Sequence, residues 1–294
     1  PLIRGIAQSR SVVPVELPFT DPVVAGAPGF DAYRQTSAAV MEALRREAST
    51  AGSAARTLAF TLIVDALSQG PKQLAGWEDV APGNFTGKGF DQCNTVRQYK
   101  MDAWLKHSPY RAVGVYISGA SRFCREQPNL TPKWVRNQLT RGWKILPITL
   151  GPQASCLNRF PRYGADIDPT INPSRTDGFA AAKKQAVREA NIAVAEAKRL
   201  GIVPGSTLYY DLEGFDINHS INCRNSAVWF LSSWTLRLHR LGYASGVYSS
   251  AGSGIVLLER ARVSQPAGYH DPDQIWIARW DGKANTSTTY IPDT

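Results

Sequence analysis

The stretch "TLYYDLEG" (residues 207–214) combines the pattern of a buried strand with two carboxylates, Asp211 and Glu213. Side chains alternate between the two faces of a strand, so both acids share a face with Tyr209, while Tyr210 and Leu212 point to the other face. The apolar face can then pack against helices. Glu213 lies nearer to the carboxyl end of this predicted strand, where a turn begins.

Five other short apolar segments alternate with helical patterns along the chain. Strands are predicted at 88–93, 111–118, 143–151, 207–214, 244–250 and 274–282, with helices at 94–107, 131–141, 175–200, 225–241 and 254–262. This alternation indicates parallel strands, because each helix returns the chain to the same end of the sheet. A barrel and an open doubly wound sheet both fit. No glycine-rich phosphate-binding motif follows any strand, which favours the barrel.

The first 86 residues follow a different pattern. They open with a segment rich in Pro, Ala and Val, followed by helical stretches at 34–49 and 53–69. We therefore predict an extended segment plus helices over residues 1–86 and an irregular, TIM-like (β/α) barrel over residues 87–294. Three roles for the N-terminal extension stay open: docking a partner, covering the barrel or bracing it.

Composition limits the classes of partner. The net charge is +9, which favours anionic partners, but Lys and Arg are scattered and form no nucleic-acid-binding module. We expect a polyanionic glycan or simple solvation rather than nucleic acid, no membrane span and a monomer. The histidines show no metal-ligand spacing, so neither a metal nor a cofactor is predicted.

Acidic residues end three of the predicted strands. Asp91 in "GFDQC" ends the first strand and Asp281 in "IARWDG" ends the last, in addition to Asp211 and Glu213. A single acid at a strand end commonly caps a helix or forms a turn. Four carboxylates at one rim repel one another and lower stability, so their presence together suggests a function. Glycoside cleavage is a reaction that uses such a group of acids. We predict Glu213 as general acid/base, with its pKa raised by Asp211, and assisting roles for the other three.

Aromatic residues near this rim are candidates for stacking on sugar rings. The predicted substrate-binding residues are Trp280, Tyr248, Tyr116 and Tyr209, together with Gln153 in the loop after the third strand. The alternative for the aromatic residues is a purely structural place in the core.

The four cysteines each follow a predicted strand. An even number of cysteines suggests disulfides, and four cysteines allow three pairings. Because consecutive strands are usually neighbours, we predict Cys93 with Cys124 and Cys156 with Cys223. Disulfides indicate a secreted or cell-surface protein, and since the chain begins at Pro1 we expect its signal peptide to be absent from this form. Free thiols in a cytoplasmic protein are the alternative.

Four motifs carry a resemblance to a known family. In their order "GFDQC", "YYDLEG", "GVYSS" and "IWIARWDG" resemble the bacterial glycoside-hydrolase-like domain catalogued as domain of unknown function 1906, which is similar to the family-25 lysozymes. The resemblance spans about residues 88–282. It implies an irregular (β/α) barrel with an acidic site at its carboxyl rim, Asp91 as the first-strand Asp, Asp211 and Glu213 as the D-x-E pair with Glu213 as the acid, and Asp281 as the late Asp.

The resulting hypothesis is a secreted, retaining glycoside hydrolase that acts on a cell-wall polysaccharide or a peptidoglycan-like glycan. The alternative is a catalytically inactive carbohydrate-binding module on a hydrolase-like barrel. The segment 151–175 differs from the lysozyme pattern, so the substrate is expected to differ as well.

Overall fold

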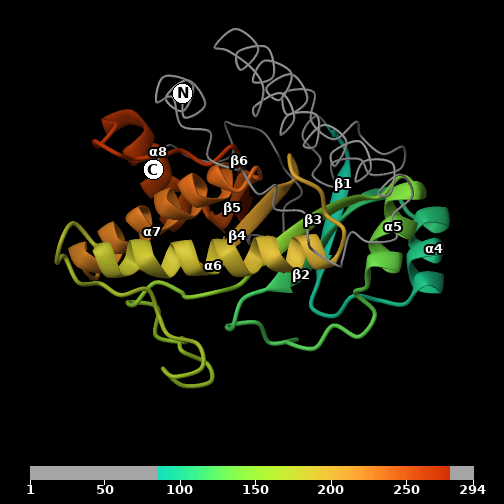
Figure 1. Cartoon of the computed structure of the whole chain (residues 1–294), viewed down its shortest axis with the longest axis horizontal. Coiled ribbons are helices and arrows are strands. Elements are labelled where there is room, and N and C mark those ends of the chain that lie inside the picture. The colour runs from blue at the N-terminus through green and yellow to red at the C-terminus, as the bar shows by residue number, and fades with distance from the viewer. Residues whose placement is uncertain (1–84, 279–294) are drawn as a thin grey trace, which may run out of the picture. The chain divides into compact units, whose positions relative to one another are not determined.

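The computed structural model describes residues 85–278, which form one parallel sheet with helices between its strands (Figure 1). The strands are β1 (Lys88–Gln92), β2 (Tyr110–Ser118), β3 (Lys144–Thr149), β4 (Thr207–Leu212), β5 (Ala244–Ser250) and β6 (Gln274–Ala278). Their order across the sheet equals their order along the chain. Such a sheet curls like part of a barrel, whereas a doubly wound sheet reverses direction at a switch point.

The described residues therefore form a curled α/β half-barrel. The predicted α/β class and all six predicted strands are confirmed, although β3 ends at Thr149 rather than at residue 151. Within residues 85–278, β1 and β6 are not paired with each other, so a closed TIM barrel is not seen there. The predicted N-terminal extension lies, up to residue 84, outside the described residues.

Each crossover between strands contains a helix. The helices are α4 (Gln98–His107), α5 (Pro132–Thr140), α6 (Ala180–Arg199), α7 (Ile221–Arg240) and α8 (Val256–Ser264), with a π-helical turn, η1 (Ala251–Ile255), before α8. Helix α7 begins earlier than the predicted residue 225 because the Ser220 hydroxyl accepts a hydrogen bond from the Cys223 N–H and caps it. None of the helices in the described part of the chain is long and apolar enough to cross a membrane.

Strand β4 shows the predicted alternation. Tyr210 faces the helices, where its ring centroid lies 4.9 Å from that of Phe230 and 5.1 Å from that of Trp234, both on α7. Tyr209 faces the opposite side and packs with Ala112, Leu146 and Trp276 in a small separate cluster. This second side is the concave face of the half-barrel, and it also carries Asp211.

The alanine stripe on α6 allows close helix packing. Ala182, Ala186, Ala190, Ala193 and Ala197 are all fully buried, and α6 lies against α7 and against β2 and β3 (Figure 1). Gly201 follows the helix with φ +76°, a left-handed conformation that ends it at low cost. The small side chains let α6 cover the convex face of the sheet.

We expect Ala190→Leu to lower the free energy of unfolding by about 1–3 kcal/mol, because the added carbons have no space in this buried stripe. Ala195→Leu on the exposed side of the same helix should change it by less than about 0.5 kcal/mol. Urea unfolding of both variants measures the difference. Equal stabilities for the two variants would contradict the packing described for α6.

Candidate active site

Four of the predicted site residues converge on the concave face of the sheet. They come from β1, β2, β4 and β5, and are Asp91, Tyr116, Asp211 and Tyr248. The Tyr116 hydroxyl donates a hydrogen bond of 3.3 Å to Asp211 Oδ2. Burial raises the pKa of Tyr116, and the nearby carboxylates of Asp211 and Asp91 and the Tyr248 phenol raise it further. The predicted meeting of Asp91 with Asp211 at one site is therefore seen.

A glycine on β2 makes room for Asp91. Gly114 is paired with Asp91 across the strands, and a Cβ at Gly114 would lie 2.8 Å from the Asp91 Cβ and 2.9 Å from Ile148 Cδ1. Any side chain at this position would force Asp91 or Ile148 to shift. The "AVGVY" pattern of β2 thus contains a small residue that the acidic site needs.

Asp211 is almost completely buried, with 3% of its surface exposed. Burial raises the pKa of its carboxyl well above the ordinary value, and the charges of Glu213 and Asp91 raise it further, while the Tyr116 hydrogen bond and Arg159 oppose them. Asp211 Oδ1 has no hydrogen-bond partner among the described residues. Asp211 is therefore the deep acid of the site, and its surroundings favour the neutral form of its carboxyl.

Glu213 lies just beyond the end of β4 and is more exposed than Asp211. Its Oε2 forms an ion pair of 2.6 Å with Arg159 Nη2, from the loop between β3 and α6. Of the two acids it is Asp211, the deeper one, whose pKa burial raises, while the expectation stated for Glu213 stays a prediction. Depth along the strand, rather than proximity in sequence, decides which carboxyl is desolvated.

Gln153 connects the two acidic residues through their backbone. Its side-chain Nε2 donates to the Asp211 carbonyl at 2.8 Å and to the Gly151 carbonyl at 3.1 Å, and its Oε1 accepts the Glu213 N–H at 2.9 Å. Gln153 is fully buried. The predicted ligand contact of Gln153 stays a prediction; in the structure its amide bonds to backbone groups and holds the D-x-E pair in position.

The three predicted aromatic residues within the described part differ in depth. Tyr209 is buried, with its hydroxyl hydrogen-bonded to the Gln274 side chain, and belongs to the packing of the concave face. Tyr116 and Tyr248 are half-buried nearer the acids. Trp276, which was not predicted, is half-exposed and packs edge-to-face on Tyr248 with ring centroids 5.2 Å apart. The alternation of Trp276 with Ile275 and Ile277 in the sequence indicates that Trp276 faces the opposite side of the strand from the two isoleucines, and this could have predicted its place.

Trp280 and Asp281, predicted as a substrate-binding residue and an assisting acid, lie outside the described residues. Both remain predictions.

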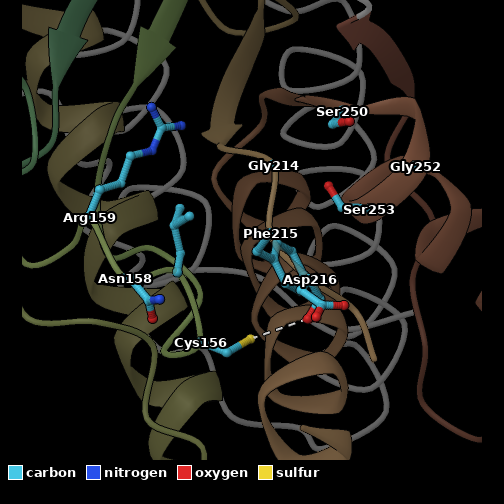
Figure 2. Close-up of a pocket in the computed structure, with 10 residues that line it drawn as sticks. Cys156, Asn158, Arg159, Gly214, Phe215, Asp216, Ser250, Gly252 and Ser253 are labelled. Atoms are coloured by element: carbon cyan, nitrogen blue, oxygen red, sulfur yellow. Dashed lines mark hydrogen bonds between the residues drawn. The ribbon is translucent and has the colours of Figure 1, made fainter. Parts of the chain in front are cut away.

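A pocket of about 620 Å³ opens next to Glu213 at the carboxyl ends of the strands. Three segments line it: residues 156–159 after β3, residues 214–216 after β4, and Ser250 at the end of β5 with Gly252 and Ser253 in η1. Figure 2 shows Asn158 and Arg159 on one side and Ser250 and Ser253 on the other, with Gly214, Phe215 and Asp216 between them. Its volume is in the range of small-molecule and sugar-binding sites.

Both predicted disulfides are present. Cys93 pairs with Cys124 and Cys156 with Cys223, with Cα–Cα distances of 5.6 and 6.0 Å. The second disulfide joins a pocket-lining loop to the first turn of α7, and Cys156 N–H also donates to Cys223 Sγ. Among the described residues, no three His, Cys, Asp or Glu side chains are arranged to hold a metal ion.

A parallel half-barrel with carboxylates and a pocket at the carboxyl ends of its strands is an arrangement of the glycoside-hydrolase-like class. Residues 102–294 match the sequence profile described as the Rv2525c-like, glycoside hydrolase-like domain. The chain belongs to this family, as the motif resemblance predicted. The match begins after β1, so it covers Asp211 and Glu213 but not Asp91.

Two solved structures are similar to this chain. One, an uncharacterized B. stearothermophilus protein, is 20% identical, with 69% of this chain and 78% of that chain covered and a TM-score of 0.43. The other, the Mycobacterium tuberculosis Tat-secreted protein Rv2525c in complex with HEPES, is 15% identical, with 63% and 76% covered and a TM-score of 0.41. No curated protein matches this chain.

We expect Asp211→Asn to raise the free energy of unfolding at pH 7. A carboxyl whose pKa is raised by folding destabilises the folded state as the pH rises above its unfolded value of about 3.9, and Asn removes that cost. The stabilisation should therefore vanish near pH 3.5 and grow towards neutral pH. Denaturation across this pH range measures it, with exposed Asp166→Asn as the control. A loss of stability at pH 7 would contradict the raised pKa.

We expect Gln153→Glu to lower the free energy of unfolding by at least about 2 kcal/mol, because the carboxylate cannot donate to the Asp211 and Gly151 carbonyls. Gln265 also donates to a backbone carbonyl, that of Arg262, but at the surface. Gln265→Glu is therefore the matched control and should cost much less. Urea unfolding compares the two, and a Gln153→Glu protein as stable as the wild type would exclude the positioning role.

Proposed function

We propose that the protein is a glycoside hydrolase that cleaves a polysaccharide of the cell wall or a related glycan, with Glu213 as the general acid/base. The observation that carries this proposal is the D-x-E pair at the end of β4, beside Asp91 and Tyr116 and at the edge of the 620 Å³ pocket. Membership of a glycoside-hydrolase-like family supports the same reaction class.

Glu213 is the residue of the pair that a substrate can reach. Its side chain is 26% exposed, and its ion-pair partner Arg159 and its neighbour Gly214 both line the pocket. In glycoside cleavage the acid protonates the leaving oxygen and then, as a base, activates water. Asp211, two residues deeper on the same face of β4, assists by orienting a substrate group. Asp91 adds negative charge that favours an oxocarbenium-like centre.

The half-exposed aromatic residues suit a sugar substrate. Tyr248 and Trp276 form an edge-to-face pair on the concave face, and Tyr116 lies beside the acids. Sugar rings bind well to such aromatic surfaces because their C–H faces are apolar. A retaining outcome, with a direct or substrate-assisted nucleophile, remains part of the proposal.

We further propose an extracytoplasmic location. Two disulfides among the described residues support it, because stable disulfides are rare in reducing compartments. The glycans of the cell wall lie in the same compartment, so location and proposed substrate agree.

We expect Glu213→Gln to lower the turnover of peptidoglycan or another wall polysaccharide by about 10²-fold or more, because the amide cannot donate and recover a proton. Release of reducing ends measures turnover. Glu259→Gln is the matched control, since Glu259 is also paired with an arginine, Arg262, but lies on α8 away from the pocket. Wild-type protein that binds these glycans without releasing product, or equal turnover by wild type and Glu213→Gln, would overturn the proposal.

A further inference from the structure

Arg159 has hydrogen-bonding capacity that its ion pair does not use. Its guanidinium has five N–H donors, of which only Nη2 has a hydrogen-bond partner among the described residues, namely Glu213. The side chain is 52% exposed at the edge of the pocket. An arginine with free donors in a pocket is suited to bind a carboxylate through two parallel hydrogen bonds.

The backbone that carries Arg159 is fixed on both sides. Cys156 is bonded to Cys223 at the start of α7, and its Sγ lies 3.7 Å from the carbonyl oxygen of Asp216, which lies between the two sides of the pocket (Figure 2). Phe160, directly after Arg159, is buried. The guanidinium can therefore change partners by rotation of its side chain while the loop stays in place.

The opposite wall offers neutral polar groups. Ser253 lines the pocket, is 2% exposed, and its Oγ has no hydrogen-bond partner among the described residues. Gly214 keeps this wall open, because a Cβ there would lie 3.1 Å from Ser250 Cβ and 3.7 Å from Ser253 Oγ. A ligand with one anionic group and several hydroxyls would match a cation on one wall and hydroxyls on the other.

The ion pair occupies the carboxylate that the proposed mechanism needs. Glu213 Oε2 lies 2.6 Å from Arg159 Nη2, and this contact must open before that oxygen can reach a substrate. An incoming anion would compete with Glu213 for Arg159. Once Arg159 binds that anion, the partly exposed carboxyl of Glu213 is free to face the leaving oxygen of the substrate.

We propose that Arg159 is a specificity-determining residue that binds a carboxylated sugar unit in the 620 Å³ pocket and, in doing so, releases Glu213 from its ion pair. The substrate is then an acidic glycan, such as one containing uronic acid or another carboxylate-bearing sugar. The net charge of +9 favours the approach of such a polyanion. This inference rests on the proposed function for the role of Glu213, but the binding step does not require turnover.

The test is a binding measurement with defined probes. Glucuronate, galacturonate and N-acetylmuramate, each paired with its methyl ester, are titrated into isotopically labelled protein at pH 7 and followed by NMR chemical shifts. We expect at least one acid to bind the wild type about tenfold or more tightly than its ester. Arg159→Gln should abolish this preference, and Arg159→Lys should retain part of it, because lysine keeps the charge but not the fork of donors.

Two further variants separate this role from a general charge effect. Glu213→Gln should strengthen binding of the acid, because it removes the internal competitor for Arg159. Arg162→Gln removes the same charge from the same loop, where Arg162 lies over the Phe160 ring and does not line the pocket, and should bind like the wild type. Weaker binding in Glu213→Gln, equal binding of every acid and its ester, or an unchanged preference in Arg159→Gln would each overturn the proposal.

The outcomes distinguish this inference from the proposed function. A carboxylate preference that depends on Arg159, without turnover of any glycan, would support the inference and rule out the proposed hydrolase activity. Turnover that depends on Glu213 but is the same for acidic and neutral glycans, and unchanged in Arg159→Gln, would support the proposed hydrolase function. It would rule out the role inferred for Arg159.

Discussion

Where the pairing of β3 with β4 ends, the side-chain amide of Gln153 takes the place of a neighbouring strand. The ladder between β3 and β4 ends with the pair Thr149 and Tyr210, after which the chain turns away from the sheet. The Gln153 amide then bonds to the Asp211 carbonyl and the Glu213 N–H, which are the backbone groups that a neighbouring strand would bind. The acidic end of β4 thus stays ordered while the departing loop leaves space for the pocket.

This arrangement gives two carboxyls on one strand different surroundings. Asp211 is buried on the concave face beside Tyr116, where burial favours the neutral form of its carboxyl. Glu213, two residues further along the chain, lies nearer the surface beside Arg159. Paired acids with unlike environments are typical of sites that perform acid–base chemistry, because one group can hold a proton while the other is ionised. The short distance along β4 also couples them, so a change of partner at Glu213 affects Asp211.

Local patterns were enough to predict much of this structure. The period-two alternation of β4 predicted the faces of Tyr210 and Asp211, and strand order predicted both disulfides. The roles of Gln153 and Arg159 could not be predicted, because both depend on the path of the long segment between β3 and α6, which no periodicity describes. The raised pKa of Asp211 was not predicted, since sequence spacing does not report how deeply each residue of a strand lies.

The central claim is that β4 presents a buried Asp211, whose pKa is raised by burial, beside an arginine-paired Glu213. A ¹³C NMR titration of protein labelled at the aspartate carboxyl carbons tests it most directly, with the Asp211 signal assigned by its absence in Asp211→Asn. The account predicts that this carboxyl titrates well above the ordinary value of about 3.9, and that it is still protonated when the exposed aspartates are ionised. A midpoint at or below the ordinary value would contradict it.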